Sequence, residues 1–395
     1  MNYSTIAADE WAGQPLTRDE VFWTSKLGHC SFPSRLIQRS TPFEIFQRTS
    51  APSPSEISTI FGDRDFTSAD VKFARISDIT IDDQLGVCID RAGRVLHETA
   101  SIAEAIDPGL ANTRALSPRA SRQMVDEPVI HCFHRASPAY GHFIFDCLAP
   151  ILLLRDVILS GRAKILIPSF FPAWGPRILS AVGFDIASHV RFITKDVAVC
   201  REVMLSTAID SRNCFRPVRE ICQSLTRLPE AVHPSSRKMI YLTRRNQVTY
   251  SDRTISNEDE VVRALMKMGF AIIEPGNLAF EEQVSLFHGA DIVVAAHGSA
   301  FGNLPFSRPR STLIDLMPTT YINYWSRRNF APERWALNLT TFFQLNYLLV
   351  FCQSHTVEAA AKGASSPIVS TVDIDLLERA VNAAKAFPQI GRAHV

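Results

Sequence analysis

The sequence of 395 residues has no long hydrophobic run, no excess of one charge and no leader-like beginning. Its longest apolar stretch, residues 148–154, is far shorter than the roughly 20 residues that a membrane-spanning helix needs. Basic residues number 41 and acidic residues 40, which argues against a nucleic-acid-binding protein. Residues 1–20 lack a basic segment followed by an apolar one, so we predict no signal peptide. We therefore expect a soluble, globular protein without a transmembrane segment.

The eight cysteines are scattered, with no CxxC pair and no spacing typical of zinc ligands. Most lie in apolar runs, where a free thiol behaves as a small hydrophobic side chain. We interpret them as reduced and structural, which favours a cytoplasmic location. The sequence also has no GxGxxG after a strand and no GxxxxGK[ST], which argues against a dinucleotide site and a P-loop.

Two stretches of alternating strand and helix patterns make up most of the chain. The first extends over residues 129–205 and the second over residues 239–316, with the polar residues 230–238 between them as a candidate linker. Such alternation predicts an α/β fold with a parallel, right-handed, doubly wound sheet. Residues 1–125 show few clear periods, and we interpret residues 50–58 as a loop.

This organisation predicts an N-terminal α/β domain over residues 1–235, a second α/β domain over residues 236–350 and an extension over residues 351–395. The extension contains an amphipathic helix, residues 374–387, which Asp373 caps and which we expect to pack back on the N-terminal domain. Its last residues, 389–395, read QIGRAHV and resemble a translated sequencing adapter, so we interpret them as non-native.

Ligands of doubly wound sheets bind outside the carboxyl ends of the strands. Arg244 follows the strand at residues 239–243, and Arg253 lies further along the same loop. Residues 297–299 (His-Gly-Ser) follow the strand at residues 292–296 and begin a short helix. A helix N-terminus offers N–H groups to an anion, and arginine forms paired bonds with phosphate. The pattern predicts a metal-free diphosphate site, although solvated arginines and a structural histidine are alternative interpretations.

Five segments also resemble a known family. They are YLTRR at 241–245, RTISNE at 253–258, FEEQ at 280–283, HGSAFGNL at 297–304 and IDLMP at 314–318. In order and spacing they resemble the core of glycosyltransferase family 61, also called DUF563 or capsular polysaccharide biosynthesis proteins. YGHFIFD at 140–146 resembles the family's YGHFLLD motif. The family's HGAGLTN reads HGSAFGN here, a departure at Ser299 and Ala300 that bears on the fit of the donor.

The resemblance implies a GT-B architecture, with two Rossmann-like domains facing across a cleft. It further implies inverting transfer from a nucleotide-sugar donor, usually UDP-linked, to a glycan acceptor. The domain at 236–350 would bind the donor and the domain at 1–235 the acceptor. The donor-binding residues are then Arg244, Arg253, Asn257, Glu258, Gln283, His297, Gly298, Ser299, Ala300 and Asn303. For Asn257 the alternative is a capping box with Glu260.

His142 and Asp146 are four residues apart on a predicted helix and therefore share a face. Inverting transfer needs a general base for the acceptor hydroxyl, and we predict that one of these two residues serves, oriented by the other. A zinc site made from them together with His131 and His134 is a weaker alternative, because residues 131 and 134 point to different faces of a strand.

No cofactor is expected. Of the two DxD matches that could hold a metal, residues 63–65 lie in a poorly patterned region and residues 373–375 are better explained as a helix cap. Two alternative functions stay open. One is a catalytically inactive sugar- or nucleotide-binding homologue, which only the HGSAFGN departure favours. The other is a different nucleotide-sugar enzyme on the same scaffold.

Overall fold

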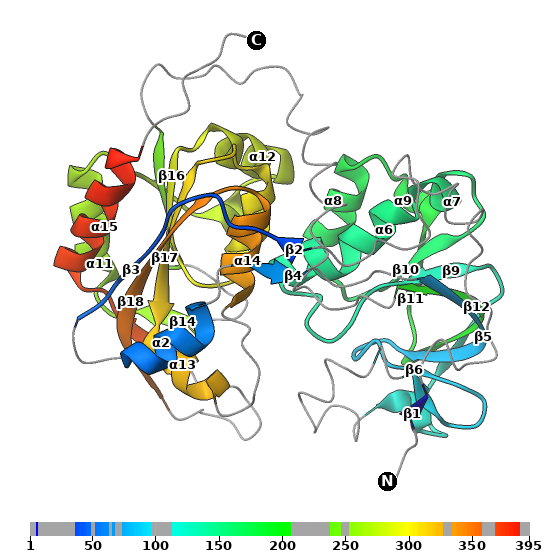
Figure 1. Ribbon diagram of the computed structural model, residues 1–395. Coiled ribbons are helices and arrows are strands. Elements are labelled where there is room, and N and C mark those ends of the chain that lie inside the picture. Colours follow the sequence, from blue (N-terminus) through cyan, green and yellow to red (C-terminus); the bar gives the residue numbers. More distant parts are fainter. Residues whose placement is uncertain are drawn as a thin grey trace. The chain divides into compact units, whose positions relative to one another are not determined.

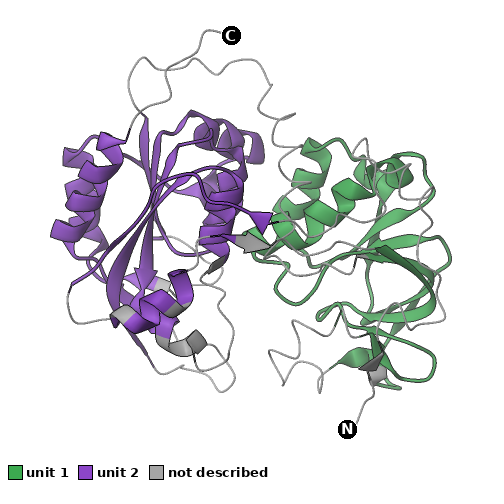
Figure 2. Cartoon of the chain, viewed as in Figure 1, with its two compact units in different colours: residues 1–35, 67–221 green, residues 36–66, 222–395 purple. Residues whose placement is uncertain are grey.

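The computed structural model describes residues 5–6, 36–48, 52–62, 65–67, 73–96, 99, 113–206, 238–245, 253–326, 334–357 and 368–387. The chain divides into two compact units, which Figure 2 shows in different colours. Unit 1 comprises residues 1–35 and 67–221, and unit 2 comprises residues 36–66 and 222–395. Each unit combines a sheet with helices, so the predicted α/β class is confirmed.

The sheet of unit 1 mixes parallel and antiparallel strands. Its described strands are β1 (Thr5–Ile6), β5 (Phe73–Asp82), β6 (Cys88–Ile89), β7 (Val95–Leu96), β8 (Arg122–Val125), β9 (Val129–His131), β10 (Lys164–Pro168), β11 (Val190–Ile193) and β12 (Val197–Ser206). The order is β1-β7-β6-β5-β12-β9-β10-β11, with β8 also paired to β12. Strand β9 is parallel to β10 on one side and to β12 on the other. Because the chain leaves β9 for β10 and returns beyond it to β12, β9 and β12 flank a topological switch point.

The helix predicted after β9 is confirmed as a series of consecutive helical segments. They are α5 (Tyr140–His142), the π-helix η2 (Phe143–Leu148), α6 (Ala149–Leu153) and α7 (Arg155–Leu159). All residues of η2 are buried, since its sequence FIFDCL is apolar except for Asp146. Unit 1 also contains η1 (Arg114–Leu116), α8 (Trp174–Ala181) and α9 (Ile186–His189).

The sheet of unit 2 is doubly wound. Its described strands are β3 (Phe43–Phe46), β13 (Met239–Leu242), β14 (Arg253–Ile255), β15 (Ala271–Ile273), β16 (Ile292–Ala296), β17 (Thr312–Pro318), β18 (Asn346–Thr356) and β19 (Ile368–Thr371). The order is β14-β19-β18-β17-β16-β13-β15, with β3 also on β18. The five parallel strands from β13 to β18 thus follow the order 2-1-3-4-5, in which the switch point lies between β13 and β16. The short strands β2 (Leu36–Ile37) and β4 (Phe66–Thr67) form a separate pair.

Helices cover both faces of this sheet. Figure 1 shows α11 (Glu258–Lys267) and α15 (Ile374–Ala386) on one face and α12 (Phe280–Gly289) and α14 (Arg334–Phe342) on the other. The remaining helices of unit 2 are α2 (Pro54–Phe61), η3 (Pro275–Asn277), the 3-10 helix η4 (Ser299–Phe306) and α13 (Thr319–Ser326). Strands covered on both faces must be apolar on both, as the sequence IVVAA of β16 is.

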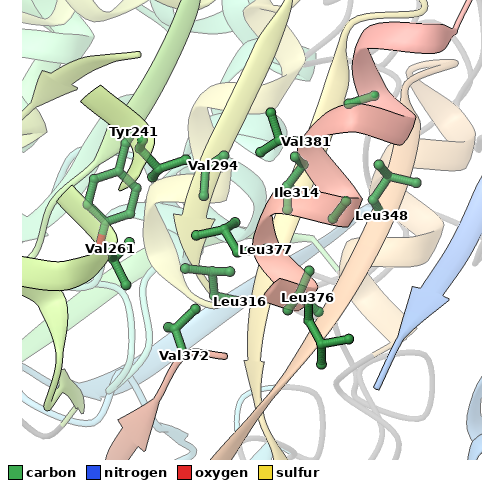
Figure 3. Close-up of a cluster of buried hydrophobic side chains, with 14 of the residues drawn as sticks. Tyr241, Val261, Val294, Ile314, Leu316, Leu348, Val372, Leu376, Leu377 and Val381 are labelled. Atoms are coloured by element: carbon green, nitrogen blue, oxygen red, sulfur yellow. The ribbon is translucent and has the colours of Figure 1, made fainter. Parts of the chain in front are cut away.

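The last helix, α15, belongs to the core of unit 2. Its residues Leu376, Leu377 and Val381 lie in one buried cluster with Ile314 and Leu316 of β17, which Figure 3 shows. We expected this helix to pack back on the N-terminal domain, and that expectation is wrong: its apolar face is buried in unit 2 instead. The predicted N-cap is confirmed, because the Asp373 side chain accepts a hydrogen bond from the backbone N–H of Leu376.

Two local predictions are wrong. Residues predicted as a loop form α2, where Ser53 and Glu56 make a capping box and Pro54 occupies the first turn. Asn257 precedes α11 but makes no side-chain cap. Its amide instead pairs with the backbone of Val372, donating to the carbonyl over 2.8 Å and accepting from the N–H over 3.0 Å.

Several predictions fall on residues that are not described. They are most of the linker at 230–238, Asp63 and Arg64 of the first DxD match, and residues 389–395. Within the described ranges, Cys88, Cys132, Cys147, Cys200 and Cys352 are buried free thiols, as predicted. No helix of the described part combines the length and the apolar character that a bilayer crossing requires.

Candidate functional site

A buried aspartate with two histidines lies at the carboxyl end of β9. The Oδ2 atom of Asp146, on η2, accepts hydrogen bonds from His134 Nε2 and from His142 Nδ1, each over 2.7 Å. The side chain of His134 is 3% exposed and that of His142 is 39% exposed. The predicted contact between His142 and Asp146 is therefore confirmed, and His134 joins it from the turn after β9.

The protons of both rings can be assigned from their partners. The backbone N–H of Ala136 donates to His134 Nδ1 over 3.1 Å, so in the neutral ring the proton is on Nε2, which donates to Asp146. A carboxylate only accepts hydrogen bonds, so His142 donates to it from Nδ1. In that tautomer, Nε2 is the basic nitrogen of His142, on the ring that is partly exposed.

Asp146 stays charged although it is fully buried. Burial alone would raise the pKa of its carboxyl group, but the hydrogen bonds from His134 and His142 outweigh burial and lower the pKa below its ordinary value. The other carboxylate oxygen, Oδ1, is buried and has no hydrogen-bond partner among the residues that the structure describes. Both hydrogen bonds that stabilise the charged carboxylate are therefore made to one oxygen, Oδ2.

His131 does not join this cluster. Its Nε2 lies 2.7 Å from the carbonyl oxygen of Gly86, and burial lowers its pKa to about 4. His131 ends β9 whereas His134 lies in the following turn, so the two rings have different surroundings. This agrees with the argument that residues 131 and 134 cannot share one set of ligands.

The remaining three residues could still be considered for a metal. His134 Nε2, His142 Nδ1 and an oxygen of Asp146 all lie within 4.8 Å of one another. A metal ligand nitrogen must carry a lone pair, however, and the bond from the Ala136 N–H leaves the lone pair of His134 on Nδ1. The donor set therefore fits a hydrogen-bonded cluster better than a metal centre.

In unit 2, the residues predicted around a diphosphate meet at the switch point of the sheet. Arg244 follows β13, and its Nη1 lies 3.5 Å from the carbonyl oxygen of His297, which follows β16. Both border a narrow pocket with an accessible volume of about 10 Å³, which is space for about one water molecule. The full lining comprises Arg244, Thr254, Ile255, Ala296, His297, Leu316, Pro318, Cys352 and Ser370.

The turn after β16 is held in a backbone geometry that needs glycine. Gly298 has φ 150° and ψ −161°, a combination that essentially only glycine adopts. Ser299 and Ala300 then begin η4, whose first N–H groups have no partner within the helix. Gln283 and Asn303 lie behind the turn, where the amide of Asn303 donates to Gln283 Oε1 over 2.8 Å and ties α12 to η4.

His297 also bonds to a buried aspartate. Its Nδ1 lies 2.8 Å from Asp315 Oδ2 on β17, and the hydroxyl of Tyr347 on β18 donates to the same oxygen over 2.8 Å. The side chain of His297 is 6% exposed, and its ring packs against Phe301. This arrangement links β17 and β18 to the residue that follows β16 and fixes the start of the turn.

Two predicted donor residues serve the scaffold in this structure. Oε1 of Glu258 is buried and accepts from the hydroxyls of Tyr241 and Thr243 and from the backbone N–H of Arg244. Asn257 bonds to the backbone as described above. The backbone of Arg253 lies in β14, but its side chain is outside the described part of the chain.

A larger cavity in unit 1 contains none of the predicted site residues. Its accessible volume is about 570 Å³, and it lies beside β5, β8 and β12. Its charged lining mixes both signs, and Arg91 and Asp78 there pair over 2.7 Å. Because these charges neutralise one another, the cavity is a less suitable reaction site than the cluster at His142.

A comparison with protein families adds a finding that is independent of this geometry. The family model of glycosyltransferase 61 matches residues 140–314. The chain carries a glycosyltransferase 61 domain. The match begins at the helix with His142 and Asp146 and extends through β13, the Arg244 turn and η4 into β17. The domain is that of a glycosyltransferase, which acts on a sugar donor and an acceptor. A comparison with curated proteins found no significant match.

His134 was named from the sequence only as a possible metal ligand, and it lies before the matched residues. The signal that could have found it is local. His134 is followed by a turn in which its own N–H bonds to Ser137 Oγ over 2.8 Å and the Ser137 N–H bonds back to its carbonyl oxygen over 2.9 Å. A histidine in a serine-containing turn before the helix is the pattern to look for.

Proposed function

We propose that the chain transfers a sugar from a nucleotide-sugar donor to a glycan hydroxyl with inversion at the anomeric carbon. The observation that carries this proposal is the pairing of His142 with buried Asp146 at one switch point, in a chain whose other switch point carries an arginine and a helix N-terminus. The first arrangement suits a general base, and the second suits a leaving diphosphate.

On the donor side, the diphosphate would lie against Arg244 and the first turn of η4. The guanidinium and the backbone N–H groups of Ser299 and Ala300 would stabilise the negative charge that develops on the departing nucleoside diphosphate. Gly298 supports this proposal because its backbone geometry lets the chain approach a phosphate closely. Gln283 and Asn303 would hold the turn rather than contact the donor.

On the acceptor side, Nε2 of His142 would remove the proton of the attacking hydroxyl. The acceptor oxygen then bonds to the anomeric carbon as the bond from that carbon to the diphosphate breaks, and the electron pair leaves with the nucleoside diphosphate. Asp146 would hold the imidazole in the correct tautomer and stabilise the imidazolium that forms. Neither step requires a metal or another cofactor, and the tautomer of His134 supports a metal-free reaction.

The same proposal includes three further features. They are a GT-B arrangement of the two units, a UDP-linked donor and a cytoplasmic location, which the free thiols in both units fit. An inactive homologue is the competing function, since the turn departs from the family pattern at Ser299 and Ala300. The retained glycine at 298 supports the enzyme.

The proposal is tested by thermal unfolding with UDP, GDP, CMP, ADP and NAD, each with EDTA. A nucleotide at 100 times its dissociation constant adds about 2.7 kcal/mol to the stability of the protein. We expect UDP or GDP to raise the melting temperature in EDTA, and Arg244→Ala to abolish the rise. Arg245→Ala is the matched control, because Arg245 pairs with Asp259 on α11 instead of facing the pocket. A rise with NAD alone, or none at all, would overturn the proposal.

A further inference from the structure

His134 is the member of the unit 1 cluster that the reaction as described does not use. It is buried, it lies outside the helix that carries His142 and Asp146, and it shares one acceptor atom with His142. A buried histidine that touches only protein groups cannot remove a proton from an acceptor. Its chemistry must act through the carboxylate.

The turn after β9 determines which nitrogen of His134 donates. Ala136 N–H occupies Nδ1, and the backbone N–H of His134 bonds to Ser137 Oγ. Ser137 is fully buried and also accepts a hydrogen bond from the thiol of Cys147, on η2, over 3.1 Å. The ring is thus fixed from two sides, with Nε2–H directed at Asp146 Oδ2.

Without the hydrogen bond from His134 Nε2, the Asp146 carboxylate would be held by His142 alone among the described residues. Its Oδ1 has no hydrogen-bond partner among the described residues, so the donors to Oδ2 are His134 and His142. His142 is the more exposed of the two and is the residue that must change its protonation state during the reaction. A fixed donor is therefore needed to keep Oδ2 in place while His142 reacts.

We propose that His134 is a positioning residue, whose Nε2–H holds the Asp146 carboxylate so that His142 keeps its proton on Nδ1 and its basic lone pair on Nε2. This inference rests on the proposed role of His142 as the general base. It adds a third residue to the reaction site, one that lies outside the matched family segment. The same tautomer argues against the metal alternative, because it places a hydrogen on Nε2 of His134.

The substitutions follow from the geometry. His134→Gln keeps an N–H donor near the position of Nε2, whereas His134→Leu removes the donor and keeps an apolar side chain in a buried site. His131→Leu is the matched control, because His131 is also buried but its Nε2 contacts the carbonyl oxygen of Gly86 instead of Asp146. The melting temperature of each variant separates lost positioning from lost folding.

The test is a long-range ¹H–¹⁵N correlation spectrum of protein labelled with ¹⁵N-histidine, recorded at neutral pH, where no substrate is needed. We expect His134 to be protonated on Nε2 in the wild type and in His131→Leu. His142 should be protonated on Nδ1 in these two proteins and in His134→Gln. In His134→Leu, His142 should lose its single tautomer and acquire the Nε2-protonated form, with kcat reduced about tenfold and donor affinity unchanged.

Two outcomes would overturn the inference: a wild-type His134 protonated on Nδ1, or a His142 that keeps the Nδ1 tautomer in folded His134→Leu. Neither depends on turnover. Failure of the proposed function is recognised separately, because the tautomers would then be as expected while no nucleotide sugar is consumed.

Discussion

Units 1 and 2 contain the same small arrangement, a buried aspartate beside a histidine at a switch point, yet the two differ in what surrounds them. Asp146 bonds to two histidines, one of them 39% exposed. Asp315 bonds to a histidine that is 6% exposed and to a tyrosine hydroxyl. The exposed ring can exchange a proton with a substrate, whereas the enclosed one can only hold a turn. Exposure of the histidine, more than its pairing with aspartate, therefore distinguishes the candidate catalytic residue from the structural one.

The largest effects should come from making the same substitution in both units. His142→Gln removes the proposed base and should lower kcat about 10²–10⁴-fold with little change in stability. His297→Gln weakens a buried bond to a carboxylate and should lower the free energy of unfolding by about 1.5–3 kcal/mol. Steady-state transfer rates and chemical denaturation measure the two quantities. Equal losses of rate at unchanged stability would erase the distinction between the units.

Protonation of His131 in acid should destabilise unit 1. The pKa of His131 is lowered to about 4 by burial, so between pH 6.5 and about 4 the unfolded chain binds a proton that the folded chain does not. Stability is therefore fully present above pH 6.5 and falls by up to about 1.4 kcal/mol for each pH unit below it. Hydrogen exchange of β9 and β12 amides across this range checks the effect. His131→Leu should flatten the dependence, and an unchanged slope in this variant would assign it to other groups.

A substitution in the turn after β16 of unit 2 should have a smaller effect on stability and nucleotide binding. Gly298→Ala places a Cβ on a backbone with φ 150° and should cost about 1–3 kcal/mol of stability. It should also weaken the stabilisation by UDP or GDP, because the first N–H groups of η4 move. Isothermal titration with the nucleotide identified by thermal unfolding provides the measurement. Unchanged affinity in this variant would remove the turn from the donor site.

The smallest effect concerns a residue that the sequence assigned to the donor. Asn257→Ala breaks the amide pair with Val372 and should lower stability by about 1 kcal/mol without changing nucleotide affinity. Denaturation and titration on the same preparation distinguish the roles. A loss of affinity at full stability would return Asn257 to the donor-binding residues.

Local patterns predicted much of this molecule. The strands at 239–243 and 292–296, the helix that begins at Tyr140 and the contact of His142 with Asp146 all follow from spacing within one element. The cap at Asp373 follows from a short-range bond in the same way. Such features depend on neighbours three or four residues away, which the sequence displays directly.

Features that depend on distant partners were not predictable. The amide of Asn257 could cap its helix, but a strand-end carbonyl 115 residues away competes for it and wins. The register of β12 against β9, which creates the switch point in unit 1, joins residues more than 70 positions apart. The helix α2 was missed for a different reason, since its capping box is visible in the sequence but was outweighed by Pro and Ser content.

The most direct test of the central claim is the release of nucleoside diphosphate from a nucleotide sugar in EDTA, measured for the wild type and Asp146→Asn side by side. The account predicts that the wild type releases it without a metal. Asp146→Asn should bind the nucleotide as well as the wild type does. It should produce nucleoside diphosphate from the nucleotide sugar at least about 100-fold more slowly, because His142 then loses its correct tautomer. Release by Asp146→Asn at the wild-type rate would contradict the account.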